Sequence, residues 1–390
     1  MSFVSIIIPV FNQLHYTRQC LESVWSTTAG HDLEVIVFDN GSTDGTLEYL
    51  RSAQASQPAL VVQHSDKNLG YSPANNQAAE IARGDRLVLL NNDTITTPGW
   101  LSALLAPLEH AAVGIVGARL IYPGREIINH AGYVYSSRLN SFYLLYEGVR
   151  RDFPAAQKTR QFQAVLGACV ALRRADFNAV GGLSDFGLED VDLCLKLRNR
   201  GLMVQYHPAA TLYHYGQMTI RNSPTGSIPV HSSREFQEHW PPSRLESDDL
   251  RYYQEDGVVP HYTSSGRIVA VSGEPQFQSL LGAISQRTLS PEYLTPGNCR
   301  VIVEGCFGNP LVLMELLQIL VECRAAEGAA LFCMHWHMYM PSLPEPLLYG
   351  AKLLEKLGHH EQARDLAARG LGMGYLSDEE RNEFRSIGRF

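Results

Sequence analysis

Polar side chains stand where several apolar segments of the chain end. The run DRLVLLN (85–91) passes into Asn91, Asn92 and Asp93, and LEVIVFD (33–39) ends on Asp39 before NGSTDG. Asn and Asp are ordinary turn formers, because their side chains hydrogen-bond nearby backbone. Several such ends on one edge of a sheet can also bind a ligand, so these side chains are candidates for a binding site.

A second group of acids opens a helical pattern in LEDVDLCLKLRN (188–199). The leucines and Val191 have helical spacing, which places Glu189, Asp190 and Asp192 at or near a helix N-terminus. The helix dipole favours acids there, so a purely structural role accounts for them when the motif is taken alone. They also follow a glycine-rich turn, and a carboxylate so placed is a candidate general base for a bound ligand.

The elements that must position these residues alternate between short apolar runs and amphipathic segments. The runs are rich in Val, Ile and Leu and too short for ordinary helices; they cover residues 4–10, 33–39, 59–64, 85–91 and 113–120. Helical spacing in the segments between them predicts an α/β fold with a mostly parallel sheet flanked by helices. Ligands of such sheets bind outside the carboxyl ends of the strands.

The remainder of the chain divides into three parts by its character. Residues 160–215 form a further block of strands and turns, and the polar segment 241–305 reads as a linker or wrapping segment. Residues 306–390 lack strand alternation and predict a small helical domain. Within it, LGHHEQARDLAARGL resembles about one tetratricopeptide hairpin, with small residues at Gly358, Ala363, Ala367 and Gly370, and a plain helical bundle fits nearly as well.

Composition excludes several classes of protein. The 390 residues carry a net charge of −8, which argues against a broad basic surface for nucleic acid. Seven cysteines form no CxxC pair, as expected for reduced thiols in the cytoplasm. No apolar run approaches the roughly 18 residues of a membrane-spanning helix, which leaves only peripheral membrane contact open. DNGSTDGT lacks the spacing of a dinucleotide fingerprint, so a dehydrogenase is disfavoured.

The motifs taken in order resemble those of one known family. They are SIIIPVFN, VFDNGSTDGT, NLGYSPANNQAA, LLNNDT, GACVALRR, GGLSDFGLEDVDLCLKLRNRG and YHYGQMT. This series is similar to that of the family 2 inverting glycosyltransferases, which have the GT-A fold. The resemblance covers about residues 3–255 and lies in the ordered set rather than in any single piece. It implies that residues 1–240 form a nucleotide-sugar glycosyltransferase domain.

The resemblance also implies a metal site. LLNNDT takes the place of the family's DxD motif, and only Asp93 keeps the carboxylate, so Asp93 is the implied ligand for Mn²⁺ or Mg²⁺. His214 in YHYGQMT matches a position that often supplies a further ligand, although a strand-end histidine with an ordinary hydrogen bond is the alternative. Asn91 departs from the pattern, which puts the role of that first position in doubt.

Donor binding is implied at the first strand ends. The matching residues are Pro9, Phe11, Asp39, Asn68, Gly70 and Asn92. Asp39 matches the aspartate that contacts the nucleobase imide, and uracil and thymine share that edge. The donor is therefore expected to be a UDP- or dTDP-linked sugar.

Inverting transfer needs one base, and the resemblance assigns it to Asp190, with Glu189 as the nearest competitor. Expected acceptors are a saccharide, a lipid-linked saccharide or a protein, and the helical tail is expected to bind a partner protein or to self-associate.

The alternative is a degenerate glycosyltransferase-like scaffold, which the loss of the first DxD carboxylate favours. A nucleotidyltransferase would need a basic glycine-rich loop that FNQLHY does not provide. The enzyme reading requires that Asp39, Asp93, Asp190 and His214 share one pocket.

Overall fold

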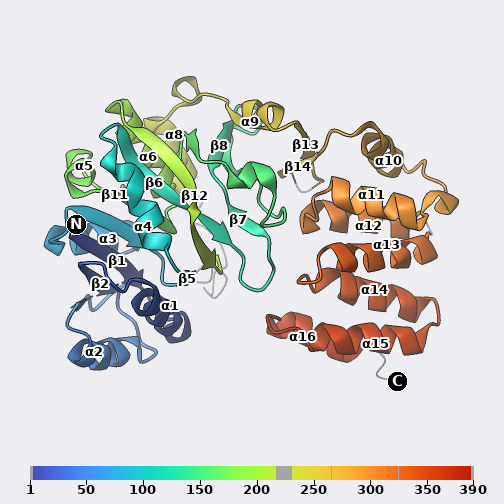
Figure 1. Ribbon diagram of the computed structural model, residues 1–390, viewed down its shortest axis with the longest axis horizontal. Helices are drawn as coiled ribbons and strands as arrows, with labels where there is room; N and C mark the ends of the chain where they lie inside the picture. Colours follow the sequence, from blue (N-terminus) through green and yellow to red (C-terminus); the bar gives the residue numbers. More distant parts are fainter. Residues whose placement is uncertain (1–2, 217–230, 265, 324, 388–390) are drawn as a thin grey trace. The chain divides into compact units, whose positions relative to one another are not determined.

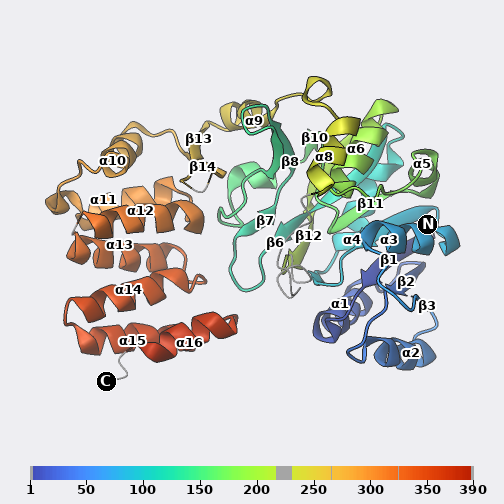
Figure 2. The ribbon, with the colours of Figure 1, turned by 180° about the vertical axis from the view of Figure 1, so that it is seen from behind.

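The computed structural model describes residues 3–216, 231–264, 266–323 and 325–387. The chain divides into two compact units (Figures 1 and 2). The first comprises Met1–Ile121, Asn129–Leu145 and Ala156–Asp248, and the second comprises Tyr122–Ile128, Tyr146–Ala155 and Asp249–Phe390. Two short segments from the first half of the chain therefore belong to the C-terminal unit.

A ten-stranded sheet forms the centre of the first unit, in the order β10-β12-β6-β11-β4-β1-β2-β3, with β5 and β7 at the side of this path. β1, β2, β3 and β4 are parallel, whereas β11 runs antiparallel to both of its neighbours, β4 and β6. The strands are β1 (Val4–Val10), β2 (Leu33–Asp39), β3 (Leu60–His64), β4 (Arg86–Leu90), β5 (Thr94–Thr96), β6 (Val113–Ile121), β7 (Ile128–His130), β10 (Arg160–Phe162), β11 (Cys169–Arg173) and β12 (Met203–His214). The expected sheet is thus parallel in its N-terminal half and mixed beyond it.

Helices flank this sheet, as Figure 1 shows, and the expected α/β class is confirmed. Its interior is made by the fully buried runs of β1, β2 and β4, against which Leu21 and Trp100 pack. Burial on both faces explains why these strands are continuously apolar. The helices are α1 (Leu14–Thr27), α2 (Thr46–Ser56), α3 (Tyr71–Ile81), α4 (Trp100–Leu105), α5 (Arg174–Ala179), α6 (Glu189–Asn199) and α8 (His231–His239), with a hairpin of β8 (Tyr133–Ser136) and β9 (Ser141–Leu144).

Strand pairing brings distant polar residues to one edge of the sheet. Parallel register sets Val10 opposite Asp39, so β1 and β2 end together. Antiparallel register sets Cys169 opposite Leu90, so the residues before β11 lie where β4 ends. β5 pairs with β12 and sets Thr94 opposite His214. The segment after β4 therefore meets both the start of β11 and the end of β12.

The second unit consists mainly of helices. They are α9 (Asp249–Glu255), α10 (Pro275–Ser285), α11 (Pro296–Gly305), α12 (Pro310–Glu322), α13 (Ala326–Tyr339), α14 (Glu345–Lys356), α15 (His360–Leu371) and α16 (Asp378–Ser386), with a hairpin of β13 (Val258–Tyr262) and β14 (Ile268–Ser272). Helices α11–α16 stack in successive layers, orange to red in Figure 1. Within the described residues, no helix combines the length and apolarity that crossing a lipid bilayer requires.

Small residues allow close helix packing in this unit, although not all in the expected way. Ala363 and Ala367 are buried, and Gly370 lies against Phe384, whose ring a Cβ at Gly370 would meet at 2.2 Å. Gly358 instead lies in the turn between α14 and α15 with φ +83°, a conformation that glycine adopts without strain. Whether this hairpin is a tetratricopeptide repeat stays a prediction.

Candidate active site

Asp93 and His214 lie together at the edge of the sheet. Asp93 follows β4, and His214 is the last residue of β12. The Oδ1 atom of Asp93 is 3.3 Å from Nε2 of His214, and the two residues are 8% and 5% exposed. The amide of Tyr215 also donates to the carbonyl of Asp93 at 3.0 Å. Two residues far apart in the sequence thus form one carboxylate–imidazole pair.

The two asparagines before Asp93 hold the turn in place. The amide N–H of Asn91 donates to the carbonyl of Ala168 at 2.9 Å, and the Nδ2 atom of Asn92 donates to Oγ1 of Thr17 at 3.0 Å. The hydroxyl of Thr94 donates to the carbonyl of Asn91 at 2.7 Å. The Asn92 amide thus contacts helix α1 through Thr17.

The imidazole of His214 has the arrangement of a metal ligand. Its Nδ1 atom lies 2.8 Å from Oδ1 of Asn129, an oxygen that only accepts hydrogen bonds, so Nδ1 carries a hydrogen. In the neutral ring the lone pair is then on Nε2. Nε2 is buried and makes no hydrogen bond, although Asp93 Oδ1 lies close. A neutral imidazole nitrogen beside a carboxylate oxygen suits Mn²⁺. The described residues contain no cluster of three or more His, Cys, Asp or Glu side chains around this pair.

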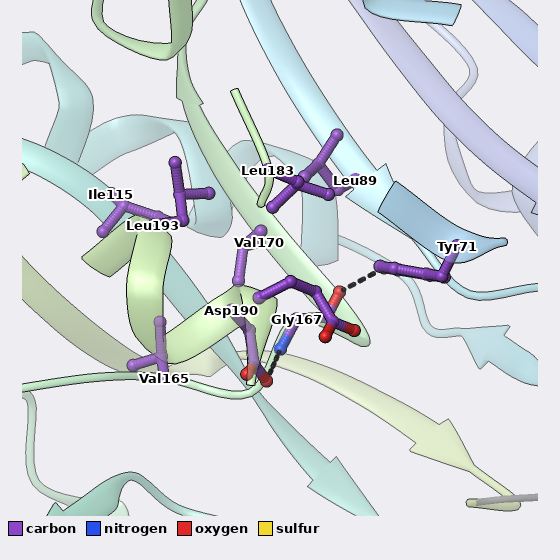
Figure 3. Close-up of a pocket in the computed structure, with 10 residues that line it drawn as sticks. Tyr71, Leu89, Ile115, Val165, Gly167, Val170, Leu183, Asp190 and Leu193 are labelled. Atoms are coloured by element: carbon purple, nitrogen blue, oxygen red, sulfur yellow. Dashed lines mark hydrogen bonds between the residues drawn. The ribbon is translucent and has the colours of Figure 1, made fainter. Parts of the chain in front are cut away.

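Glu189 and Asp190 begin helix α6 after Leu188, which has a left-handed backbone with φ 51°. The Oδ2 atom of Asp190 accepts the amide N–H of Gly167 at 2.9 Å. Figure 3 shows this carboxylate turned toward the Gly167 amide in a pocket with mostly apolar walls. The lining residues are Tyr71, Leu89, Ile115, Val165, Gly167, Val170, Leu183, Glu189, Asp190 and Leu193.

Both acids hold a proton more firmly than free carboxyls do. Burial and the neighbouring charge of Asp190 raise the pKa of Glu189 to about 7. Burial also raises the pKa of Asp190, but the amide N–H groups of Gly167 and Val191 donate to its carboxylate and oppose that rise. A pair of carboxyls with separated environments is typical of acid–base sites.

Tyr71 connects the acid pair with the turn that carries Asp93. Its hydroxyl donates to Oδ1 of Asn91 at 3.1 Å and to the carbonyl of Gly167 at 3.4 Å. Burial first, and then the charges of Glu189, Asp190 and Asp93, raise its pKa, so the phenol stays protonated. Tyr71 was not among the residues predicted from the sequence; the signal for it is its place directly after Gly70 at a helix start.

Asp39 belongs to a separate group of contacts at the end of β2. Its side chain is fully buried, its Oδ2 atom lies 2.8 Å from Nδ1 of His64, and its Oδ1 atom accepts the amide of Ser42 at 3.3 Å. Pro9 is buried within β1, and Phe11, just after that strand, is half-buried. Ser42 also accepts the amide of Asn12 through its hydroxyl at 2.7 Å.

Asn40 holds the loop that contains Asn68 and Gly70, and the sequence analysis did not single it out. Its Nδ2 atom donates to Oδ1 of Asn68 at 2.9 Å and to the carbonyl of Gly70 at 3.0 Å. Its Oδ1 atom accepts the amide of Leu69 at 2.7 Å. Gly41 lies so close to this loop that a Cβ would meet the backbone carbon of Lys67 at 2.8 Å. A glycine is therefore required for the close approach.

The expected residues take part in three sets of contacts: Asp39 with His64 and Ser42, Asp93 with His214, and Glu189 with Asp190 in the pocket of Figure 3. That they share one cavity stays a prediction. Glu189 and Asp190 line the pocket of Figure 3, whose walls, among the described residues, include none of Asp39, Asp93 and His214. Tyr71 is the link between the acid pair and the Asp93 turn. Asp192 has a structural environment, because it accepts from Trp240 and Ser184 and pairs with Lys196.

Comparison with known proteins decides the family of this domain. Residues 5–181 match the model of the family described as Glycosyl transferase family 2. This part of the chain is a family 2 glycosyltransferase domain. The expected family is thereby confirmed. The match ends before Glu189, so the acid pair and His214 lie outside the matched residues.

Two curated relatives align with longer stretches of the chain. The chain is 38% identical over 221 residues to uncharacterized protein y4gI of Sinorhizobium fredii, covering 54% of this chain and 24% of that protein. It is 33% identical over 226 residues to the O-antigen biosynthesis protein RfbC of Myxococcus xanthus, covering 56% of this chain and 18% of that protein. The chain therefore spans a quarter or less of the length of these relatives.

A solved structure gives a weaker likeness. The crystal structure of GalNAc-T7 with UDP, GalNAc and Mn²⁺ aligns with a TM-score of 0.48 and 15% identity, covering 66% of this chain and 55% of that chain.

Proposed function

We propose that this protein is a metal-dependent inverting glycosyltransferase that transfers a sugar from a UDP- or dTDP-linked donor. The observation that carries the proposal is the Glu189–Asp190 pair, which lies in an apolar pocket and is connected through Tyr71 to the turn of Asp93. Family membership supports transfer of a sugar. The identity of the donor, the need for a metal and the inverting stereochemistry go beyond family membership and are part of this proposal.

The donor side would be formed by the residues at the ends of β1, β2, β4 and β12. Asp93 and His214 would hold Mn²⁺ or Mg²⁺, which when bound stabilises negative charge on the leaving diphosphate. Asp39 would contact the nucleobase beside Phe11, with Pro9 behind it, and the Asn68–Gly70 loop, which Asn40 holds, would cover the nucleoside. Asn92 would support this side indirectly, because its amide fixes the turn through Thr17.

Asp190 would act as the base on the acceptor side. Its carboxylate takes the proton of the acceptor hydroxyl while that oxygen forms a bond to the anomeric carbon. The bond from the anomeric carbon to the diphosphate oxygen breaks at the same time, and the nucleoside diphosphate leaves from the opposite face. Burial and the charge of Asp190 raise the pKa of Glu189 to about 7, so this neighbouring carboxyl still binds a proton part of the time near neutral pH.

The acceptor is proposed to be a saccharide, a lipid-linked saccharide or a protein. The name of the Myxococcus xanthus relative, an O-antigen biosynthesis protein, favours the saccharide classes. The helical unit is proposed as a surface for a partner protein or for self-association. We also propose that the protein acts in the cytoplasm, because its seven cysteines are free thiols.

Substitution Asp190→Asn tests the proposed base. We expect turnover to fall by about 10²–10⁴-fold, because the amide cannot take the proton, while binding of the nucleotide stays nearly unchanged. Slow hydrolysis of UDP- and dTDP-sugars with Mn²⁺, together with calorimetric binding of UDP, measures both quantities. Asp185→Asn removes the same charge from an exposed position in the preceding turn and should retain activity within a few-fold. A fully active Asp190→Asn protein would refute the assignment.

The alternative is a scaffold that has lost catalysis, which Asn91 in place of the first DxD carboxylate favours. A melting experiment with and without UDP and Mn²⁺ separates the two. A protein that binds the donor gains stability from both together by mass action on the folded state. A scaffold without a donor site would melt at the same temperature in both solutions.

A further inference from the structure

The imidazole of His214 is held by a residue that has no assigned role. Asn129, in strand β7, is 4% exposed and accepts the Nδ1 proton of His214 at 2.8 Å. In a neutral imidazole, a hydrogen on Nδ1 leaves the lone pair on Nε2. That Nε2 atom is buried without a hydrogen bond and faces Asp93 Oδ1 at 3.3 Å.

Strand β7 is itself fixed at the neighbouring residue. His130 is fully buried, its Nδ1 atom lies 3.0 Å from the carbonyl of Ala118, and its Nε2 atom accepts the amide of Leu166 at 3.0 Å. Asn129 therefore lies on a strand that is hydrogen-bonded through His130 to two other segments. A group held in this way can orient another side chain with little freedom.

We propose that Asn129 is a positioning residue for the metal site: it fixes the tautomer and ring orientation of His214 so that Nε2 is presented, with Asp93, to the divalent cation. The proposal rests on the proposed function for the identity of the ligand. The second partner of a metal-binding histidine commonly has this effect, and its loss typically lowers metal affinity or activity by about 10- to 100-fold.

The test uses two substitutions at the same position. Asn129→Leu has a similar size but cannot accept the Nδ1 proton, whereas Asn129→Asp can. We expect Asn129→Leu to weaken Mn²⁺ binding by about 10- to 100-fold and Asn129→Asp to retain it within a few-fold. Mn²⁺ binding is measured by electron paramagnetic resonance in the presence of UDP.

A second readout needs neither metal nor sugar transfer. Nitrogen-15 NMR of the metal-free protein shows which ring nitrogen of His214 carries the hydrogen. Wild type and Asn129→Asp should show it on Nδ1, and Asn129→Leu should show a mixture of tautomers. This readout stands even if no donor is hydrolysed, so it separates a failure of the positioning role from a failure of the proposed function.

The control for general destabilisation is Asn309→Leu in the helical unit. Asn309 is also fully buried, donates to the carbonyl of Glu147 and caps helix α12. This substitution should lower the melting temperature without changing the His214 signals or Mn²⁺ affinity. The proposal is overturned if Asn129→Leu binds Mn²⁺ like wild type, if Asn129→Asp is as weak as Asn129→Leu, or if wild-type Nδ1 lacks the hydrogen.

Discussion

Glu189 and Asp190 are neighbours in one helical turn, yet they receive different support. Asp190 accepts two backbone N–H groups, whereas Glu189 has a pKa raised to about 7 by burial and by the charge of Asp190. Exposed Asp185 adds a smaller contribution in the same direction. Two interacting carboxyls titrate as a pair, so the pH dependence of activity belongs to both.

Activity should rise with pH through the neutral range, because the pair must lose a proton before Asp190 can act as a base. Glu189→Gln removes a like charge beside Asp190 and should move this acidic limb to lower pH. The kcat/KM profile for donor and acceptor measures the shift. Glu80→Gln, an exposed change on α3, should leave the profile in place. An unshifted limb in Glu189→Gln would show that the two acids are not coupled.

The pH dependence of the free energy of unfolding gives an independent test of the raised pKa of Glu189. The pKa of Glu189 in the folded protein lies above its ordinary value of 4.5, so the unfolded chain releases its proton first. The free energy of unfolding should therefore fall as pH rises from 4.5 to about 7, and this contribution should level off above that range. Urea unfolding across this range should show a smaller fall for Glu189→Gln than for wild type.

At the scale of elements, the turns after the strands do more than reverse the chain. The turn after β4 is held by Ala168, just before β11, and by Thr17 of α1, and the loop before α3 is held by Asn40, just after β2. Each loop thus takes its conformation from a neighbouring strand or helix. Loops positioned by a rigid scaffold are where binding residues usually lie.

Asn40→Ala should release the Asn68–Gly70 loop. Three hydrogen bonds are lost, and we expect the free energy of unfolding to fall by about 1–3 kcal/mol and nucleotide affinity to weaken. Urea unfolding and calorimetric UDP binding measure the two effects. Asn298→Ala, which removes a side-chain bond to the Tyr293 carbonyl in the helical unit, should not affect UDP binding. Unchanged UDP affinity in Asn40→Ala would separate this loop from the donor.

At the scale of the whole molecule, the helical unit is built from three stretches of the chain. Arg125, from the segment Tyr122–Ile128, forms ion pairs with Glu345 of α14 and with Glu380 of α16, the latter at 2.6 Å. Ile127 lies in the same apolar core as Val312 and Trp336. From the segment Tyr146–Ala155, the Tyr146 hydroxyl donates to Asp256. The helical region is therefore not a simple C-terminal addition.

A protein cut after Asp248 should fold poorly, because the two inserted segments lose the helices on which they pack. We expect low solubility, binding of a dye for exposed apolar surface, and a lower or absent cooperative melt. Co-expression of residues 249–390 as a separate chain should restore much of the soluble protein, which controls for the cut itself. A sharply melting 1–248 fragment without dye binding would contradict this expectation.

Local pattern was enough to predict the strands β1–β4 and β6 and the acids that follow β2 and β4. The predicted runs 4–10 and 33–39 coincide with β1 and β2, because a strand buried on both faces needs continuous apolar residues wherever it lies. The positions of Asp93 after β4 and of Glu189 and Asp190 at the start of α6 were predicted from local sequence pattern in the same way. The helical C-terminal region was also predicted, since its 3.6-residue periodicity is a local property.

Only the tertiary structure decided which side chains meet. Tyr71 hydrogen-bonds to Asn91 and Gly167, and Asn129 hydrogen-bonds to His214. Arg125 pairs with Glu345 and Glu380, the latter over a separation of 255 residues. These partners depend on the order and register of strands and on the packing of helices, which composition and periodicity do not encode. The residue types of the site are thus readable from the chain alone, whereas the hydrogen bonds that orient them exist only once the sheet has formed.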